Sequence, residues 1–181
     1  MSHQVELAPL RCINCDTPVP AEPDQVAWAC AQCAQGLLLD ESEVLLPLEI
    51  HYAPGVQSGK VGRPFWVTWG RVTLEREADQ GWFDRSENHA KRFWEEKKKF
   101  FIPAYTTSLD ELLDISAEML AHPPDLATGP QVQFEPVTLS AKDLSSLVEF
   151  IILAFEAGRK DKVKSIDISV ELDTPLLWIL P

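Results

Sequence analysis

Four cysteines have the spacing of metal ligands. Cys12 and Cys15 form one CxxC pair, Cys30 and Cys33 form a second, and the chain has no other cysteine. Thiolates in this pattern are typical of a structural zinc site, where four ligands surround the ion tetrahedrally at a Zn–S distance of about 2.3 Å. Four thiolates leave no coordination position for water or substrate. The pattern therefore predicts one structural Zn²⁺ and no zinc catalysis.

Two disulfides are the alternative for the same cysteines. Disulfides persist in oxidising compartments, and the first residues, MSHQVELAPLRC, lack the basic region and apolar run of a signal peptide. The longest apolar stretch, residues 150–155, is much shorter than the ~20 residues of a transmembrane helix. We therefore expect a soluble, cytoplasmic protein, in which zinc is favoured over disulfides.

The net charge of −12 limits the partners. Nucleic-acid binding depends on Lys and Arg side chains that neutralise phosphates, whereas Arg11 is the one basic residue in residues 1–39. Direct nucleic-acid binding is therefore not expected. An accessory role in transcription stays open, because an acidic protein can bind the machinery instead of the template.

A basic and aromatic segment offers a further alternative. Lys91, Arg92 and residues 97–99 lie close to the aromatic pairs 93–94 and 100–101. Such a strip could contact an anionic membrane surface. Glu95 and Glu96 interrupt it, however, which favours a solvated, charged helix face.

Residues 10–39 are expected to form two hairpins that carry the cysteine pairs. Each CxxC would occupy a tight turn, with a strand around Trp28 and a returning strand over residues 36–39. This segment resembles the zinc-ribbon class, and the resemblance implies metal binding by the four cysteines. It departs from the commonest form, because Asn14 and Asp16 stand where Pro or Gly often tightens the turn. We expect a flexible arm at residues 1–9 and a module boundary at residues 40–43.

Residues 44–181 are expected to form an α+β body with a mixed or antiparallel sheet and two main helices. A capping box at Ser108 starts the first helix, which ends at Pro123, and Ser140 starts the second, which ends at Gly158. The segment 88–98 is ambiguous, and we favour a helix over a strand pair. Strands are expected at residues 44–52, 64–75 (with both faces covered) and 165–172, and the apolar residues 175–180 should be buried.

A short internal sequence repeat suggests that the body consists of two similar strand-to-helix units. Phe101-x-Pro103 precedes the helix capped by Ser108, and Phe134-x-Pro136 precedes the helix capped by Ser140. The two copies are short enough to be chance. The body as a whole resembles uncharacterised bacterial proteins that join a ribbon to an α/β body, a resemblance that implies no activity.

The sequence offers little support for an enzyme. The four histidines have no metal-ligand or triad spacing, and no phosphate-binding loop is present. His51 could act as a general base, although a packed or surface histidine is the simpler interpretation.

We therefore expect a non-catalytic, zinc-binding adaptor or scaffold that acts through protein–protein contacts. The alternatives are an accessory factor of transcription, a peripheral membrane factor, or an enzyme with a site assembled from distant residues. The oligomeric state is not indicated.

Overall fold

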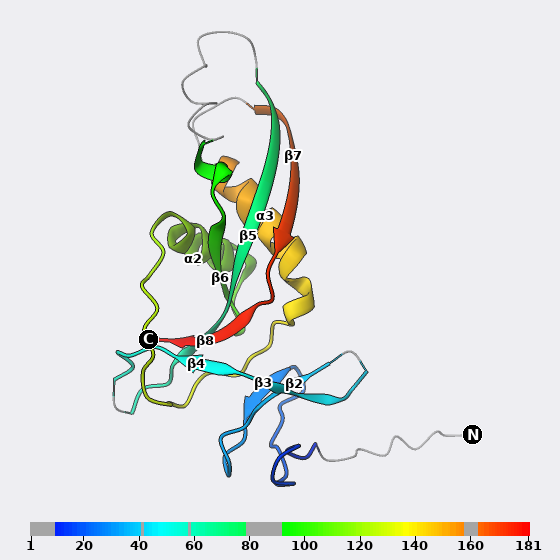
Figure 1. Cartoon of the computed structure of the whole chain (residues 1–181), viewed down its shortest axis with the longest axis vertical. Helices are drawn as coiled ribbons and strands as arrows, with labels where there is room; N and C mark the ends of the chain where they lie inside the picture. The colour runs from blue at the N-terminus through cyan, green and yellow to red at the C-terminus, as the bar shows by residue number, and fades with distance from the viewer. Residues whose placement is uncertain (1–9, 41, 58, 79–91, 158–162) are drawn as a thin grey trace, which may run out of the picture.

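The computed structural model describes residues 10–40, 42–57, 59–78, 92–157 and 163–181. The arm predicted at residues 1–9 lies outside these ranges. Figure 1 shows a small sheet at one end of the molecule and a larger sheet, backed by helices, that makes up the rest. The strands are β1 (Ala27–Ala29), β2 (Gly36–Leu39), β3 (Leu45–Leu48), β4 (Ile50–Tyr52), β5 (Arg63–Ala78), β6 (Lys98–Pro103), β7 (Val163–Leu172) and β8 (Leu176–Leu180); the helices are α2 (Leu109–Ala121), the 3-10 turn η1 (Ala141–Asp143) and α3 (Leu144–Ala157). The predicted α+β class is confirmed.

The small sheet contains three antiparallel strands in the order β1-β2-β3. The prediction of one strand over residues 44–52 is wrong, because β3 pairs with β2 whereas β4 joins the larger sheet. Asp40 accounts for this pairing. Its carboxylate Oδ1 accepts hydrogen bonds from the amides of Ser42 and Val44, both at 2.9 Å, and so folds the turn that returns β3 onto β2. The division at residues 40–43 stays a prediction.

The larger sheet is mixed. Its order is β4-β8-β5-β6, with β7 also paired to β5; β4 and β8 are parallel and the other pairs are antiparallel. The long strand β5 organises it. The first part of β5 lies between β8 and β6, and the second part pairs with β7, so β7 and β8 follow one another along the same side of β5.

Both faces of the first part of β5 are covered. Trp66 belongs to the main core cluster together with Phe100, Ile102 and the buried side chains of α3. Phe65 and Val67 point the other way and lie in a second cluster. At residues 65–67 this agrees with the covered faces predicted from the sequence, whereas Trp69, expected on a covered face, is 45% exposed. Of residues 175–180, all expected to be buried, 177–180 are buried, with Leu177 and Ile179 in the main cluster, whereas Leu176 is 42% exposed.

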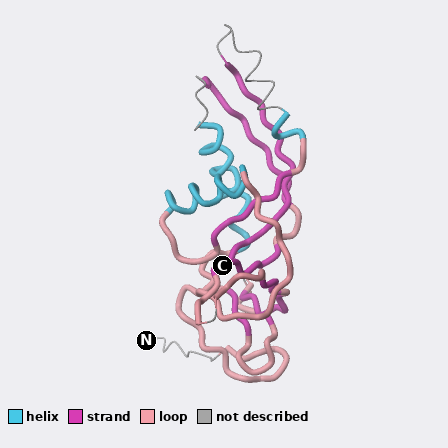
Figure 2. Tube along the Cα trace, turned by 90° about the vertical axis from the view of Figure 1, so that its left-hand side faces the viewer, coloured by secondary structure: helices cyan, strands magenta, loops and turns pink. Residues whose placement is uncertain are grey.

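The two main helices lie on one side of the larger sheet, as Figure 2 shows. The Ser108 hydroxyl accepts the amide of Glu111 at 3.2 Å and caps α2, as predicted. The Ser140 hydroxyl accepts the amide of Lys142 at 3.4 Å, and η1 then leads directly into α3. No described helix has the length and apolar character needed to cross a membrane.

The structure corrects the prediction for residues 88–98. Residues 88–91 lie outside the described ranges, residues 92–95 are helical, and Lys98 already begins β6. The basic and aromatic segment around residues 91–101 therefore does not form one continuous helix face. The Lys98 ammonium lies 4.2 Å from the centre of the Phe93 ring, whereas Lys99 lies 4.8 Å from that of Trp69. Neighbouring residues of a strand point to opposite faces, so these lysines do not share one surface.

The two Phe-x-Pro segments differ in structure. Phe101 lies within β6, whereas Phe134 makes only an isolated bridge with Gly62. The segments that follow them do contact one another, because the Thr106 and Thr138 hydroxyls lie 3.3 Å apart.

The small sheet packs directly on the body. The Val26 amide donates a hydrogen bond to the Val137 carbonyl at 2.8 Å, and Ala27 is fully buried in the main core cluster. Leu38 and Leu48, from the same side of the sheet, pack against that cluster. The other side carries the cysteines, with Trp28 and Leu37 beneath them.

Candidate metal centre

The four cysteine sulfurs converge on one point. The Sγ atoms of Cys12 and Cys33 are 3.7 Å apart, and those of Cys15 and Cys30 are 3.6 Å apart. All four Sγ atoms lie within 4.8 Å of one another, and all four cysteines are free. A tetrahedron with metal–sulfur bonds of about 2.3 Å has S···S edges of about 3.8 Å. The cysteines are therefore positioned to hold a metal ion.

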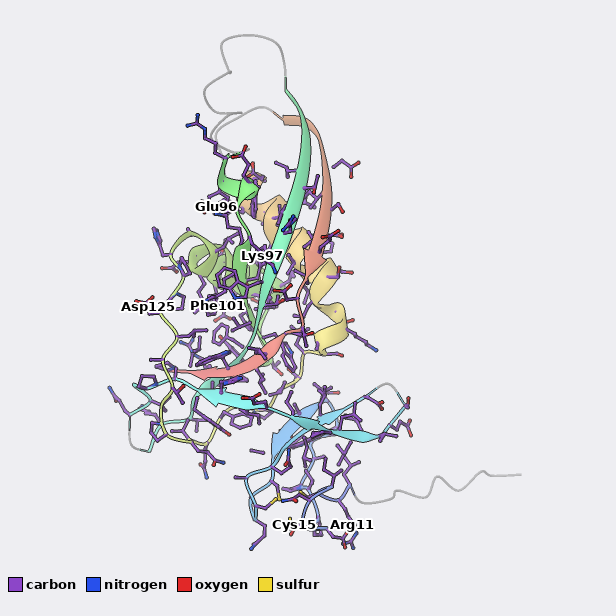
Figure 3. The ribbon with its side chains drawn as sticks, viewed as in Figure 1. Arg11, Cys15, Glu96, Lys97, Phe101 and Asp125 are labelled. Atoms are coloured by element: carbon purple, nitrogen blue, oxygen red, sulfur yellow. The ribbon has the colours of Figure 1, made fainter. Side chains whose placement is uncertain are left out.

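Each close sulfur contact joins one cysteine from each CxxC pair, so neither hairpin can form the site alone. Figure 3 shows Cys15 and Arg11 at the end of the molecule farthest from Glu96. The cluster thus lies on the small sheet, away from the helices. Cys12 and Cys30 are buried, and Cys15 and Cys33 are partly exposed.

The two cysteine turns share one backbone design. In the first, the Cys12 amide donates to the Thr17 carbonyl and the Asp16 amide donates to the Cys12 carbonyl, both at 2.9 Å. The second turn repeats both bonds around Cys30 at 2.8 Å. These bonds close each turn and hold its two sulfurs on the same side.

The residue after each second cysteine adopts a left-handed backbone conformation. Asp16 has φ 59° and Ala34 has φ 61°. Asp is among the residues that tolerate this region, which explains how the first turn forms without the Gly common there. Ala34 is less suited, because its Cβ approaches the following carbonyl oxygen. Ala34 is not predicted from its residue type, but its position can be: like Asp16, it directly follows the second cysteine of a CxxC pair.

Ala34→Gly is expected to stabilise the small sheet by up to about 1 kcal/mol, because glycine has no Cβ to strain at positive φ. Amide exchange over residues 30–39, or thermal unfolding of the metal-loaded protein, would measure the gain. Ala29→Gly is the matched control. Ala29 lies in β1, where glycine should lower stability by a similar amount. A loss of stability in both variants would contradict strain at Ala34.

The thiols differ in their ionisation. A hydrogen bond from the Asn14 side chain lowers the pKa of Cys33 to about 6. Backbone amides of Cys33 and Gln32 lower the pKa of Cys30, whereas burial raises the pKa of Cys12 to about 11. Thiolates are the metal-binding form, so at neutral pH metal binding must displace the proton of Cys12.

The comparisons with known proteins add no family. No protein-family model, curated protein or solved structure matches the chain.

A cleft of about 600 Å³ lies beside the second cysteine turn. Cys33, Gly36 and Glu49 are among the residues that line it, so one side of the cluster faces the junction between β3 and β4. His51 is not part of this cleft. Its ring stacks on Trp178 with the centroids 4.8 Å apart, as expected for a packed histidine. His89 lies outside the described residues.

Proposed function

We propose that this chain is a non-catalytic, zinc-binding adaptor of the zinc-ribbon class, which acts through protein–protein contacts in the cytoplasm. The observation that carries the proposal is the convergence of four free sulfurs within 4.8 Å of one another, two pairs of them at 3.6 and 3.7 Å. Zn²⁺ suits an all-thiolate tetrahedral site, and a reducing compartment keeps the thiols available.

A structural role for the ion follows from its ligand set. Four thiolates fill the tetrahedral shell and leave no position for a substrate. The residues packed around the cluster, such as Val19 and Trp28, form a small core that benefits from a metal cross-link. The ion would thus fix the two hairpins relative to each other.

The surroundings of the site favour protein partners over nucleic acid. Arg11 donates to the Asp16 carbonyl at 2.9 Å and pairs with the Asp16 carboxylate, so its charge is partly neutralised. Exposed apolar side chains, in the first cysteine turn and on the body, are of the kind found in protein interfaces. Ile13, Trp69 and Phe150 are each 45% exposed or more.

Metal analysis of the purified chain tests the zinc site. We expect one zinc per chain, and no disulfide under non-reducing conditions. After cobalt substitution, the visible spectrum should be that of a tetrahedral thiolate site and should not change when imidazole is added, because no coordination position is open. A spectrum that responds to imidazole would contradict the closed shell and favour a catalytic site.

Capture of partners from native cells tests the adaptor role. Captured proteins should be purified and shown to bind the zinc-loaded chain directly. Binding of bare DNA or RNA that weakens with salt, without any protein partner, would instead support a nucleic-acid function.

A further inference from the structure

The open edge of β7 is a surface that the metal centre does not explain. β7 pairs with β5 alone. Figure 1 shows these two strands projecting side by side from the sheet, with α3 crossing behind them and emerging beside the C-terminal end of β7. Within the described ranges, no residue forms a backbone hydrogen bond with the open edge between Asp167 and Leu172.

The register identifies the backbone groups on this edge. The Asp173 amide donates to the Trp69 carbonyl at 2.8 Å, which makes these residues a hydrogen-bonded antiparallel pair. In an antiparallel ladder such pairs recur every second residue. The odd-numbered residues of β7 therefore bond to β5, whereas Ile168, Val170 and Leu172 direct their N–H and C=O groups to the open edge.

Most of the other described strand edges are blocked; residues 71–78 of β5 are an exception, because they pair with β7 on one side and with no described strand on the other. Long edges are usually protected by proline, by charge or by a covering element. Pro47 interrupts β3, the Gly129 amide donates to the Tyr52 carbonyl at the end of β4, and α2 packs along β6. By contrast, β7 is ten residues long and contains no proline, although it does carry charge, at Asp167 and Glu171 among others.

The side chains of β7 define the strand that would fit beside it. One face exposes acidic and hydroxyl groups, and the other presents half-buried apolar groups that pack on the main core cluster. The exposed residues are Asp167, Ser169 and Glu171, and the half-buried residues are Ile168, Val170 and Leu172.

Opposite charges on facing positions of neighbouring strands stabilise a sheet, and like charges destabilise it. An added strand would therefore place Lys or Arg beside Asp167 and Glu171, and apolar side chains beside Val170. A second copy of β7 would bring carboxylates together, so charge opposes self-pairing. The net charge of −12 also attracts a basic partner.

We propose that β7 binds an extended segment of a partner protein, in which basic and apolar residues alternate, as an added β-strand. The proposal rests on the adaptor function and names its partner class. The backbone edge supplies the hydrogen bonds, and the acidic row on the exposed face selects the sequence.

Synthetic peptides test the proposal on the zinc-loaded full chain. The probe is an eight-residue peptide of alternating lysine and valine, with glutamate–valine and scrambled lysine–valine peptides as controls. We expect the alternating lysine peptide to bind and to slow amide exchange at Ile168, Val170 and Leu172. The control peptides should bind at least about tenfold more weakly.

Variants separate the backbone contribution from the charge contribution. Val170→Pro removes an N–H group on the open edge without removing a hydrogen bond to β5, and should weaken peptide binding by about tenfold or more. Val170→Thr keeps this N–H group, so its affinity for the peptide should lie within about twofold of that of the native chain. Glu171→Lys should weaken binding of the lysine peptide by about fivefold. Asp125→Lys, on the opposite side of the molecule in Figure 3, makes the same change in charge and should have little effect.

The outcomes distinguish this inference from the adaptor proposal. Equal binding by Val170→Pro and Val170→Thr, or peptide protection that avoids β7, would overturn the inference. So would a dimer of the native chain that Val170→Pro dissociates, because β7 would then pair with itself. If Val170→Pro does not fold, amide exchange of the native chain still decides. A chain that holds zinc and captures a partner but binds no alternating peptide would refute the edge site alone.

Discussion

Cys30→Ser is expected to abolish stoichiometric zinc binding and to unfold the small sheet. Cys30 is buried, and its Sγ lies 3.6 Å from that of Cys15 in the other hairpin. Its loss would leave three thiolates and remove one of the two close sulfur contacts that join the cysteine turns. Structural zinc contributes about 10–16 kcal/mol to the folding of isolated zinc-finger peptides. The few buried residues beneath the cluster are too small a core to replace that contribution.

The strand pairing indicates how far the damage should extend. Because β3 pairs with β2, amide protection should be lost through Leu48 and not only through Leu39. Protection should persist in β5 and α3, whose core residues lie mainly in the body. Hydrogen exchange measured by mass spectrometry, together with metal analysis, would follow both effects.

Ile13→Ser is the matched control for this prediction. Ile13 lies in the first cysteine turn, is 50% exposed and supplies no sulfur. The variant should keep its zinc and its exchange pattern. Retention of stoichiometric zinc and of protected amides over residues 10–48 in Cys30→Ser would refute a structural metal site.

The local signals in the sequence predicted local structure well. CxxC spacing led to the sulfur cluster, and the Ser108 capping box led to the start of α2. These features depend on residues close together in the chain, so composition and spacing are sufficient. The same holds for residues 36–39, whose predicted strand is β2.

Long-range pairing could not be predicted in the same way. The alternation within residues 44–52 fits one strand or two, and only the partners of β3 and β4 distinguish them. Gly36 shows why the pairing is specific. A Cβ at this position would clash with the Leu48 carbonyl oxygen and could not be accommodated by β3. Such a contact depends on the folded chain and leaves only an unremarkable glycine in the sequence.

Trp66→Ala is expected to lower the free energy of unfolding by about 3–5 kcal/mol, the usual cost of truncating a large aromatic side chain in a core. Trp66 is 1% exposed and packs between β5 and the helices. Its indole Nε1 donates a hydrogen bond to the Leu139 carbonyl at 2.8 Å, directly before η1. The substitution removes both the packing and this link. Urea unfolding of the zinc-loaded protein would measure the loss.

Trp69→Ala is the matched control, because it removes the same side chain from the same strand. Trp69 points to the opposite face, is 45% exposed and contacts the Lys99 ammonium. Its removal should cost about 1 kcal/mol or less. Equal losses in the two variants would contradict the assignment of Trp66 to the core. A large difference would show that the sheet is covered on the helix side at Trp66 and open at Trp69, where a partner could still bind.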